Sequence, residues 1–322
     1  MTEPEPLSLL TATARDGQPP EARSGPRLLG LDIGGTLSRA RLTVGGQVVA
    51  DSQAPSASLP AAGRDRATSA LTALLARLPL DPADPLDAVC AGSAGLSVPG
   101  ARQFLHDQLA PLAPPGAVVI VSDAMLVLPA AGLDAGVAVI CGTGSVAVGS
   151  WQGRTVQAGG WGYLLGDEGG GYWIVREAIR ALLGRRDRGQ PAGELGELLL
   201  AATDLADVPA LQRQFYAQPH FPREWARHAR LVLQSPDPVA ADIVARGAHV
   251  VGRLAAAALE QLGGPAGLPV VLAGGLLGDA GFRRAACEAV THQAPAGSVS
   301  VLADDPVAGA LRLAGQAAEV RS

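Results

Sequence analysis

The sequence predicts an α/β protein made of two similar lobes, and two observations predict it. The first is a repeat: an apolar strand pattern, a glycine-threonine turn and two further strand patterns around a glycine turn occur twice. The second is that helical and extended patterns alternate after each copy. Because there are only two copies, the repeat indicates a duplicated domain rather than a solenoid.

The first copy begins with three extended patterns at residues 28–33, 39–44 and 48–51. The glycine pair Gly45-Gly46 between the last two is typical of a hairpin turn. The alternating patterns that follow predict a helix over 64–78, a strand over 86–91, a helix over 99–112 and a strand over 117–121.

The second copy has its extended patterns at residues 137–141, 146–151 and 155–158. A helix over 171–183 and three helical patterns within 192–234 follow. Asp237-Pro238 is a helix-start signal and predicts a long helix to residue 262. A strand over 268–273 ends in Gly274-Gly275, and Asp305-Pro306 starts a last helix.

These patterns predict the division of the chain. Residues 1–26, rich in Pro, Glu and Thr, are expected to be a disordered tail. Residues 27–123 form the N-terminal lobe, which the C-terminal helix at 305–318 completes, and residues 124–304 form the C-terminal lobe.

The composition excludes several function classes. The chain has 322 residues and contains no Lys, so all 25 residues in its Lys and Arg count are arginine. It also contains no Asn. These absences rule out a Walker-type phosphate loop, Schiff-base chemistry and a Cys-His-Asn protease. A net charge of −5 does not favour binding to nucleic acid. The arginines between 176 and 188 are a local cluster, which we interpret as the solvated end of a helix.

The cysteines and the apolar runs indicate a cytoplasmic protein without a membrane anchor. Cys90, Cys141 and Cys287 are far apart in apolar surroundings, which favours buried free thiols in a reducing compartment. The longest uncharged stretch, 135–153, contains five glycines and alternates like strands rather than a membrane helix.

Candidate functional residues gather where predicted strands end. Ligands of open α/β sheets bind at the carboxyl ends of strands. Three glycine turns lie there and can offer backbone N–H groups to phosphate oxygens: 34–36, 142–145 and 274–275. Asp123 also follows a strand and precedes a helical run, which predicts a helix N-cap, a carboxylate that accepts a proton from a substrate hydroxyl, or both together.

The segment 159–171 is the most unusual stretch of the chain. Seven glycines surround Trp161 and the adjacent acids Asp167 and Glu168. A core strand would not tolerate so much glycine, and a disordered linker would not carry Trp, Tyr and Leu. The segment is therefore interpreted as a binding loop in which Trp161 forms a flat wall and the acids accept hydrogen bonds from a polyol. An acidic first turn of the next helix would explain only the two acids.

At these residues the sequence resembles the N-acetylglucosamine kinase family, whose bacterial branch is grouped with the benzoyl-CoA reductase-type ATPases. The resemblance covers residues 27–318 and is most specific between 141 and 173. It implies duplicated ribonuclease H-like lobes, as in actin and hexokinase, with a cleft between them. The motifs that carry it are Asp32-Ile33-Gly34-Gly35-Thr36, Ala91-Gly92-Ser93-Ala94-Gly95, Ser122-Asp123-Ala124, Cys141-Gly142-Thr143-Gly144-Ser145 and the run from Gly160 to Gly169.

The resemblance implies a kinase that uses ATP and Mg²⁺ to phosphorylate the 6-hydroxyl of an amino sugar, with N-acetylglucosamine as the first candidate. Asp123 would be the base and Asp32 would face the metal. The nucleotide would contact Gly34, Gly35, Thr36, Gly142, Thr143, Gly144, Ser145, Gly274 and Gly275. The sugar would contact Gly160, Trp161, Gly162, Asp167 and Glu168. Whether the protein forms a homodimer is left undecided, and no nucleic acid or membrane partner is expected.

The chain departs from the family where the family uses Lys or Asn. Ile33 and Leu37 replace a Gly and a Lys of the first turn, and Val146 stands where animal members have a sugar-contacting Asn. Ser56 and Ser58 are the nearest polar residues to a second such Asn. Which sugar is used therefore stays open among N-acetylglucosamine, glucosamine, N-acetylmuramic acid and glucose.

Three other readings share this fold. Sugar kinases with a repressor branch have the same first turn but usually bind zinc through a His and Cys cluster, and no His here lies near a Cys pair. An ATPase that activates a dehydratase through a shared iron–sulfur cluster needs closely spaced thiolates. A non-catalytic sensor is disfavoured by Asp123. The site residues, not the fold, choose among these alternatives.

Overall fold

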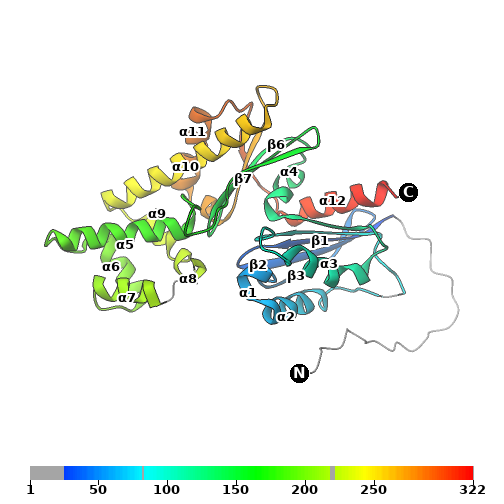
Figure 1. The fold of residues 1–322 in the computed structure, drawn as a ribbon, viewed down its shortest axis with the longest axis horizontal. Helices are drawn as coiled ribbons and strands as arrows, with labels where there is room; N and C mark the ends of the chain where they lie inside the picture. Colours follow the sequence, from blue (N-terminus) through cyan, green and yellow to red (C-terminus); the bar gives the residue numbers. More distant parts are fainter. Residues whose placement is uncertain (1–24, 82, 218–221, 322) are drawn as a thin grey trace.

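The computed structural model describes residues 25–81, 83–217 and 222–321, which form two five-stranded sheets with helices around them (Figure 1). All but the last two residues of the predicted disordered tail lie outside the described residues. The strands are β1 Arg27–Ile33, β2 Leu37–Val44, β3 Gln47–Pro55, β4 Ala88–Ser93, β5 Val118–Ser122, β6 Gly136–Cys141, β7 Ser145–Trp151, β8 Arg154–Gly159, β9 Val270–Ala273 and β10 Val299–Val301.

The helices lie mainly between the strand groups. They are α1 Leu59–Ala62, α2 Arg64–Leu75, α3 Ala101–Leu109, α4 Val127–Ala130, α5 Gly171–Asp187, α6 Gly193–Thr203, α7 Val208–Ala217, α8 Pro222–Ala226, α9 Ala229–Gln234, α10 Pro238–Leu262, α11 Ala280–Gln293 and α12 Val307–Glu319, with 3₁₀ turns η1 Ala110–Leu112, η2 Asp123–Leu126 and η3 Gly275–Gly278. In the described part of the chain, no helix has the length and apolar character of a membrane span.

The two sheets have the same topology. The first has the order β3-β2-β1-β4-β5, and the second, read from its other edge, is β8-β7-β6-β9-β10. In both, the first three strands form an antiparallel meander, the fourth pairs with the first in parallel, and the fifth pairs with the fourth in parallel. The duplicated α/β fold that the sequence repeat predicts is confirmed. We call each sheet with its covering helices a lobe.

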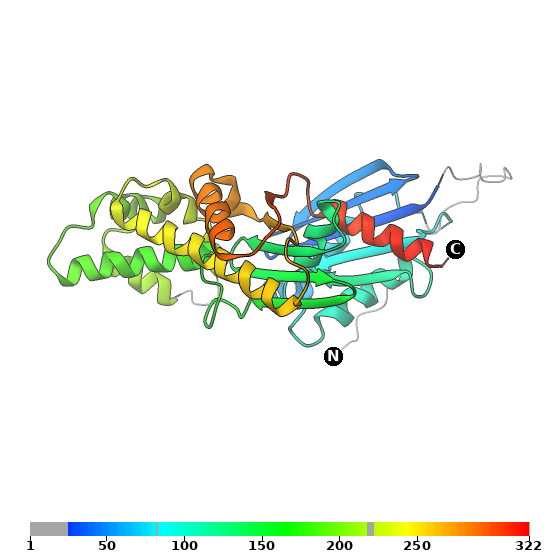
Figure 2. The same cartoon turned by 90° about the horizontal axis from the view of Figure 1, so that it is seen from above.

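Helices cover faces of both sheets (Figure 2). On the first sheet, α12 packs over β1 and β4 in one apolar cluster. α2 and α3 pack on the same sheet in a second, separate apolar cluster. On the second sheet, α10 packs over β6, β7 and β8. Both covered faces are apolar, which is why β1 and β6 are buried along nearly their whole length.

The segment between the lobes is short and closely packed. It consists of η2 and α4, and η2 contacts β1 and β4 of the first sheet as well as β6 and β7 of the second. α12 crosses it at Gly309, where a Cβ atom would lie 2.0 Å from the Leu126 carbonyl oxygen. Only glycine permits this close approach of two backbones.

Several local predictions need correction. Four helices, not three, occupy 192–234, because the short α8 stands apart from α9. The sequence patterns missed α1, α11 and β10, and the helix over 99–112 ends at residue 109 before a 3₁₀ turn. Cys287 is half-buried rather than buried, since it lies beside the core-facing row Phe282, Ala286 and Val290 of α11.

Two predictions about charged residues are also wrong. Arg185 does not belong to a solvated helix end: its guanidinium makes two hydrogen bonds, of 2.7 and 2.8 Å, to the buried carboxylate of Asp237. Asp123 is not a helix N-cap, because the cap of η2 is Ser122, and the Asp123 carboxylate accepts from the backbone N–H groups of Ala124 and of Asp123 itself. The predicted N-cap of α10 is confirmed, since Asp237 accepts from Val239.

Candidate functional site

The first glycine turn follows β1 and is held from both sides. The Gly34 N–H donates to the Leu37 carbonyl at 3.0 Å, and the Ser56 hydroxyl donates to the Gly34 carbonyl at 2.7 Å. At Gly35 a Cβ atom would meet nothing within 4 Å. The turn is therefore fixed in shape but open at its tip, as a turn that receives a ligand must be.

The second turn, after β6, is fixed by the start of α5. The N–H groups of Gly171 and Tyr172 donate to the carbonyls of Gly142 and Thr143 at 2.9 and 3.0 Å. The free N–H groups of the helix end thus have partners within the turn. Gly142 itself is open, with nothing within 4 Å of a Cβ atom.

The third turn, Gly274-Gly275, lies directly against the second. At Gly274, with φ of 111°, a Cβ atom would be 2.3 Å from the Cys141 carbonyl oxygen. This position therefore requires glycine for both its backbone angle and its close approach. Gly275 is open in the same sense as Gly35 and Gly142. The structure thus brings the two predicted nucleotide turns of the second lobe together.

Two poorly solvated carboxylates, the buried Asp32 and the half-buried Asp123, lie near each other at the ends of β1 and β5. The pKa of Asp32 is raised to about 7, mainly by burial and also by the negative charges of Asp123 and Asp305, while Arg39 opposes the shift. Burial also raises the pKa of Asp123, against the lowering effect of backbone N–H groups such as that of Ala124. The fold therefore keeps two mutually repelling acids together in a poorly solvated place.

Arg39 and Asp305 belong to this group and were not predicted. Arg39 is paired with Asp32 across β1 and β2, and its guanidinium lies 3.7 Å from the Asp32 carboxylate and 3.8 Å from that of Asp305. Asp305 comes from the segment before α12. The alternation of β2 placed Arg39 on the face of Asp32, but the approach of Asp305 depends on the tertiary fold.

The glycine-rich loop between β8 and α5 packs onto the second turn. Asp167, at φ of 59°, accepts backbone hydrogen bonds from Gly162 and Ser145, and burial raises its pKa. The Ser145 hydroxyl donates to the Glu168 carbonyl at 2.6 Å. A Cβ atom at Gly144 would lie 2.3 Å from an Asp167 oxygen. The predicted substrate loop and nucleotide turn are therefore one packed unit.

Some candidate sugar-binding side chains are exposed, and others are already hydrogen-bonded within the protein. Trp161 is 70% exposed, and Glu168 is also exposed, so both can meet a ligand. Gly160 and Gly162 have positive φ, and a Cβ atom at Gly160 would press on the Val146 side chain. Ser56 and Ser58 are buried, and their hydroxyls donate to backbone carbonyls of Gly34 and Ala94. Their donor hydrogens are therefore used within the fold.

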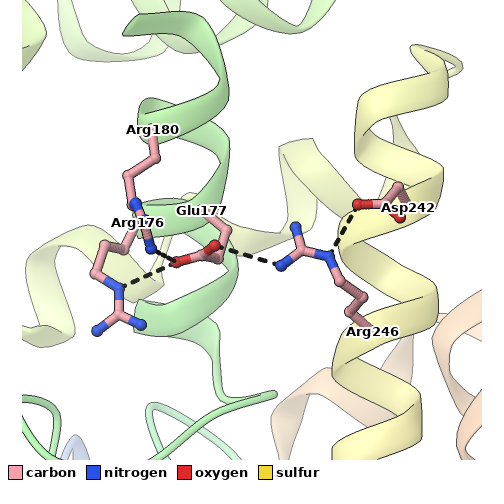
Figure 3. Close-up of polar contacts among 5 residues, drawn as sticks. All are labelled: Arg176, Glu177, Arg180, Asp242 and Arg246. Atoms are coloured by element: carbon pink, nitrogen blue, oxygen red, sulfur yellow. Dashed lines mark hydrogen bonds and ion pairs between the residues drawn. The ribbon is translucent and has the colours of Figure 1, made fainter. Parts of the chain in front are cut away.

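An ion network holds α5 and α10, the helices behind the second turn, against each other (Figure 3). The largely buried carboxylate of Glu177 accepts from Arg180 at 3.1 Å and from Arg176 and Arg246 at 3.4 Å. Arg246 also binds Asp242 at 2.9 Å and lies over the Trp173 ring. This network fixes the helix from which the second turn takes its hydrogen bonds.

One family model and several known proteins match this chain. The family model described as the BadF/BadG/BcrA/BcrD ATPase family matches residues 29–312. A structure from Chromobacterium violaceum, named as a candidate N-acetylglucosamine kinase, superposes with a TM-score of 0.69. It is 27% identical, and the alignment covers 90% of this chain and 99% of that one.

Two curated relatives match over shorter segments. An N-acetylmuramic acid/N-acetylglucosamine kinase of Clostridium acetobutylicum is 37% identical over 115 residues, which are 34% of this chain and 37% of the relative. An N-acetyl-D-glucosamine kinase of Dictyostelium discoideum is 41% identical over 71 residues, 22% of each chain. This chain therefore matches 37% of the length of the first relative and 22% of the length of the second.

Proposed function

The chain belongs to the BadF/BadG/BcrA/BcrD ATPase family, and from this premise we propose that it is an ATP-dependent kinase for the 6-hydroxyl of an amino sugar. N-Acetylglucosamine is the first candidate, since the names of the three similar proteins share it. The observation that carries the proposal is the pair of neighbouring acids, the buried Asp32 and the half-buried Asp123, beside open glycine turns.

Asp123 is proposed as the general base. A carboxylate with a raised pKa holds a proton better than a solvated one, so it suits the removal of a hydroxyl proton near neutral pH. In the reaction, the sugar oxygen bonds to the γ-phosphorus, the bond to the ADP oxygen breaks, and the hydroxyl proton moves to Asp123. The products are the sugar phosphate and ADP.

The glycine turns are proposed to hold ATP, the nucleotide of this family. Residues 34–36 and 142–145 would bind the phosphates through N–H groups and hydroxyls, and Gly274 and Gly275 would lie near the adenosine. The donor set also fits Mg²⁺, because the buried Asp32 and the nearby Asp123 leave negative charge that a divalent cation neutralises. Bound there, Mg²⁺ would neutralise charge on the phosphates, with Asp32 facing it.

The glycine-rich loop is proposed to hold the sugar. Exposed Trp161 would lie against the ring face, while Gly160, Gly162 and Glu168 would offer polar contacts. Asp167 would reach a sugar hydroxyl with the acceptor capacity that the N–H groups of Gly162 and Ser145 leave free. Because Asp167 also holds Ser145, sugar and nucleotide binding would be coupled through this carboxylate.

The second candidate function is an ATPase that activates a partner enzyme, which the family description keeps in view. It would need accessible thiolates for a shared cluster. Cys90 and Cys141 are buried, and burial raises the pKa of each thiol to about 12. Within the described residues, no three or more His, Cys, Asp and Glu side chains gather as a set of metal ligands, so no cluster-binding group is formed there. The buried thiols favour the kinase.

The test is a coupled kinase assay with N-acetylglucosamine, glucosamine, N-acetylmuramic acid, glucose and N-acetylmannosamine. We expect phosphorylation of an amino sugar, and a kcat lowered by about 10²–10⁴ in Asp123→Asn with nucleotide and sugar binding changed only a few-fold. Asp107→Asn, an exposed residue of the same lobe, is the control.

Two outcomes would contradict the proposal. If Asp123→Asn keeps more than a tenth of the wild-type turnover, Asp123 is not the base. If the purified protein phosphorylates none of the sugars but hydrolyses ATP with a partner protein, the activating ATPase is the correct function.

A further inference from the structure

Arg223 reaches from the second lobe to the phosphate turn of the first. It lies on α8, which faces the first lobe in Figure 1. Its guanidinium donates to the Thr36 carbonyl at 2.8 Å, across 187 positions of the sequence. Gly35, beside Thr36, is the open tip of that turn.

In the part of the chain that the structure describes, Arg223 is the arginine that hydrogen-bonds to the first turn. The chain contains no Lys, and Leu37 follows the turn. Arg39 is the nearest arginine in sequence, but its guanidinium faces the carboxylates of Asp32 and Asp305 at 3.7 and 3.8 Å. Beside the proposed Mg²⁺, a positively charged side chain from elsewhere in the fold would stabilise a triphosphate that binds close to these acids.

The charge of Arg223 is available for this role. Among the described residues, no carboxylate lies within ion-pair distance of its guanidinium, and the adjacent Glu224 pairs with Arg227 at 3.1 Å. Partial burial lowers the pKa of Arg223 and outweighs the opposing effect of the Glu224 charge, so the guanidinium is only partly compensated. A guanidinium in such a place gains most from an anionic ligand.

The position of Arg223 is fixed by an aromatic cluster. Trp225, two residues along α8, is buried and its ring centroid lies 5.0 Å from that of Phe215. Phe215 stacks on Tyr172 at 5.6 Å, and Tyr172 meets Tyr163 at 5.3 Å. Tyr163 belongs to the glycine-rich loop. Arg223 is therefore anchored through rings to the loop that we propose holds the sugar.

We propose that Arg223 is a catalytic residue that binds the terminal phosphate of ATP, exchanging the Thr36 carbonyl for phosphate oxygens. This rests on the proposed kinase function. The guanidinium accepts and releases no proton: it offers two N–H groups to the oxygens that gain charge as the phosphoryl group moves from ADP to the sugar. A contact across the lobes also makes this charge depend on their relative position.

The test compares two nucleotides in three variants. Calorimetry with Mg²⁺ measures the Kd of a non-hydrolysable ATP analogue, AMP-PNP, and of ADP for Arg223→Gln, Arg223→Lys and the control Arg227→Gln. We expect Arg223→Gln to weaken AMP-PNP about ten-fold or more and ADP less than three-fold, because only AMP-PNP has the third phosphate. Arg223→Lys should recover part of the loss, and Arg227→Gln should bind both nucleotides as the wild type does.

The kinetics provide the second measurement. Arg223→Gln should lower kcat at least 100-fold while the sugar KM stays within a few-fold. Equal weakening of both nucleotides would mean that Arg223 only supports the turn, and unchanged binding of both would mean that it does not meet phosphate. Either result overturns the inference. Because the binding ratio needs no sugar, it remains decisive even if the kinase proposal fails.

Discussion

Asp32 is a carboxylate in a place that suits a neutral group. It is 8% exposed, and burial together with Asp123 raises its pKa to about 7. The unfolded chain ionises this group near pH 3.8. Above that pH the folded state holds the proton more tightly than the unfolded state, so stability falls as the pH rises toward 7 and then levels off.

Replacement of Asp32 by Asn should therefore stabilise the protein in a pH-dependent way. In the absence of metal and nucleotide, we expect the free energy of unfolding of Asp32→Asn to exceed that of the wild type by a few kcal/mol, on the order of 4, at pH 8. The gain should shrink steadily toward pH 4. Urea denaturation at pH 5 and pH 8 measures it.

The control for this prediction is Asp107→Asn, whose carboxylate is exposed and should give little change at either pH. A gain for Asp32→Asn of equal size at pH 5 and pH 8 would contradict the electrostatic cause. Added Mg²⁺ should raise the Tm of the wild type more than that of the variant, because the ligand binds the folded state only.

Single site residues could be predicted where they directly follow a recognisable strand pattern in the sequence. Asp32, Asp123 and the glycine turns stand at the ends of recognisable strands, so the sequence indicates them directly. Arg39, Asp305 and Arg223 were missed because their roles depend on partners from other strands or from the other lobe. Pairing across 187 positions has no signal in a single sequence.

Among the elements, the glycine turns offer a matched pair of substitutions. Gly142 has open space where a side chain would stand, whereas at Gly144 a Cβ atom would collide with Asp167. Both follow β6 in the same turn. The two positions therefore separate the loss of a ligand cradle from the loss of packing.

Gly142→Ala should keep the Tm within about 2 °C of the wild type but weaken AMP-PNP at least ten-fold, because the methyl group occupies ligand space. Gly144→Ala should lower the Tm by several degrees, since Asp167 and its loop must move. Thermal unfolding and calorimetry measure both. Gly184→Ala, inside α5, is the control and should leave nucleotide binding unchanged. Equal Tm values for the variants at 142 and 144 would refute this distinction.

Elements were predictable in proportion to their length and periodicity. The meander strands and α10 were found within a few residues, because alternation and a capping Asp mark them. β10 has three residues and α8 five, too few for a period to show. α11 has a core-facing row of only Phe282, Ala286 and Val290 among charged and small residues, so its pattern was weak.

On the scale of the whole molecule, the two lobes should approach each other around their ligands. The proposed phosphate turns lie on both lobes, and Arg223 already crosses between them. Closure would exclude water from the transferring phosphoryl group. Small-angle scattering should show a smaller radius of gyration with AMP-PNP and N-acetylglucosamine together than with neither, and an unchanged radius in every liganded state would count against closure.

The duplicated architecture was predictable from the repeat of strand, turn and hairpin, which needs no tertiary information. How the lobes meet was not. The contact of η2 with both sheets, and the crossing of α12 at Gly309, arise from close packing of backbones that no periodicity reports.

The return of α12 to the first sheet has a consequence for synthesis. α12 packs on β1 and β4, yet the ribosome makes its residues only after all ten strands named here. Until then, one apolar face of the first sheet, including Leu28, Cys90 and Ala117, has no cover. The nascent chain therefore exposes an apolar surface through most of its translation. We expect chaperone binding and translation speed to determine the yield of folded protein.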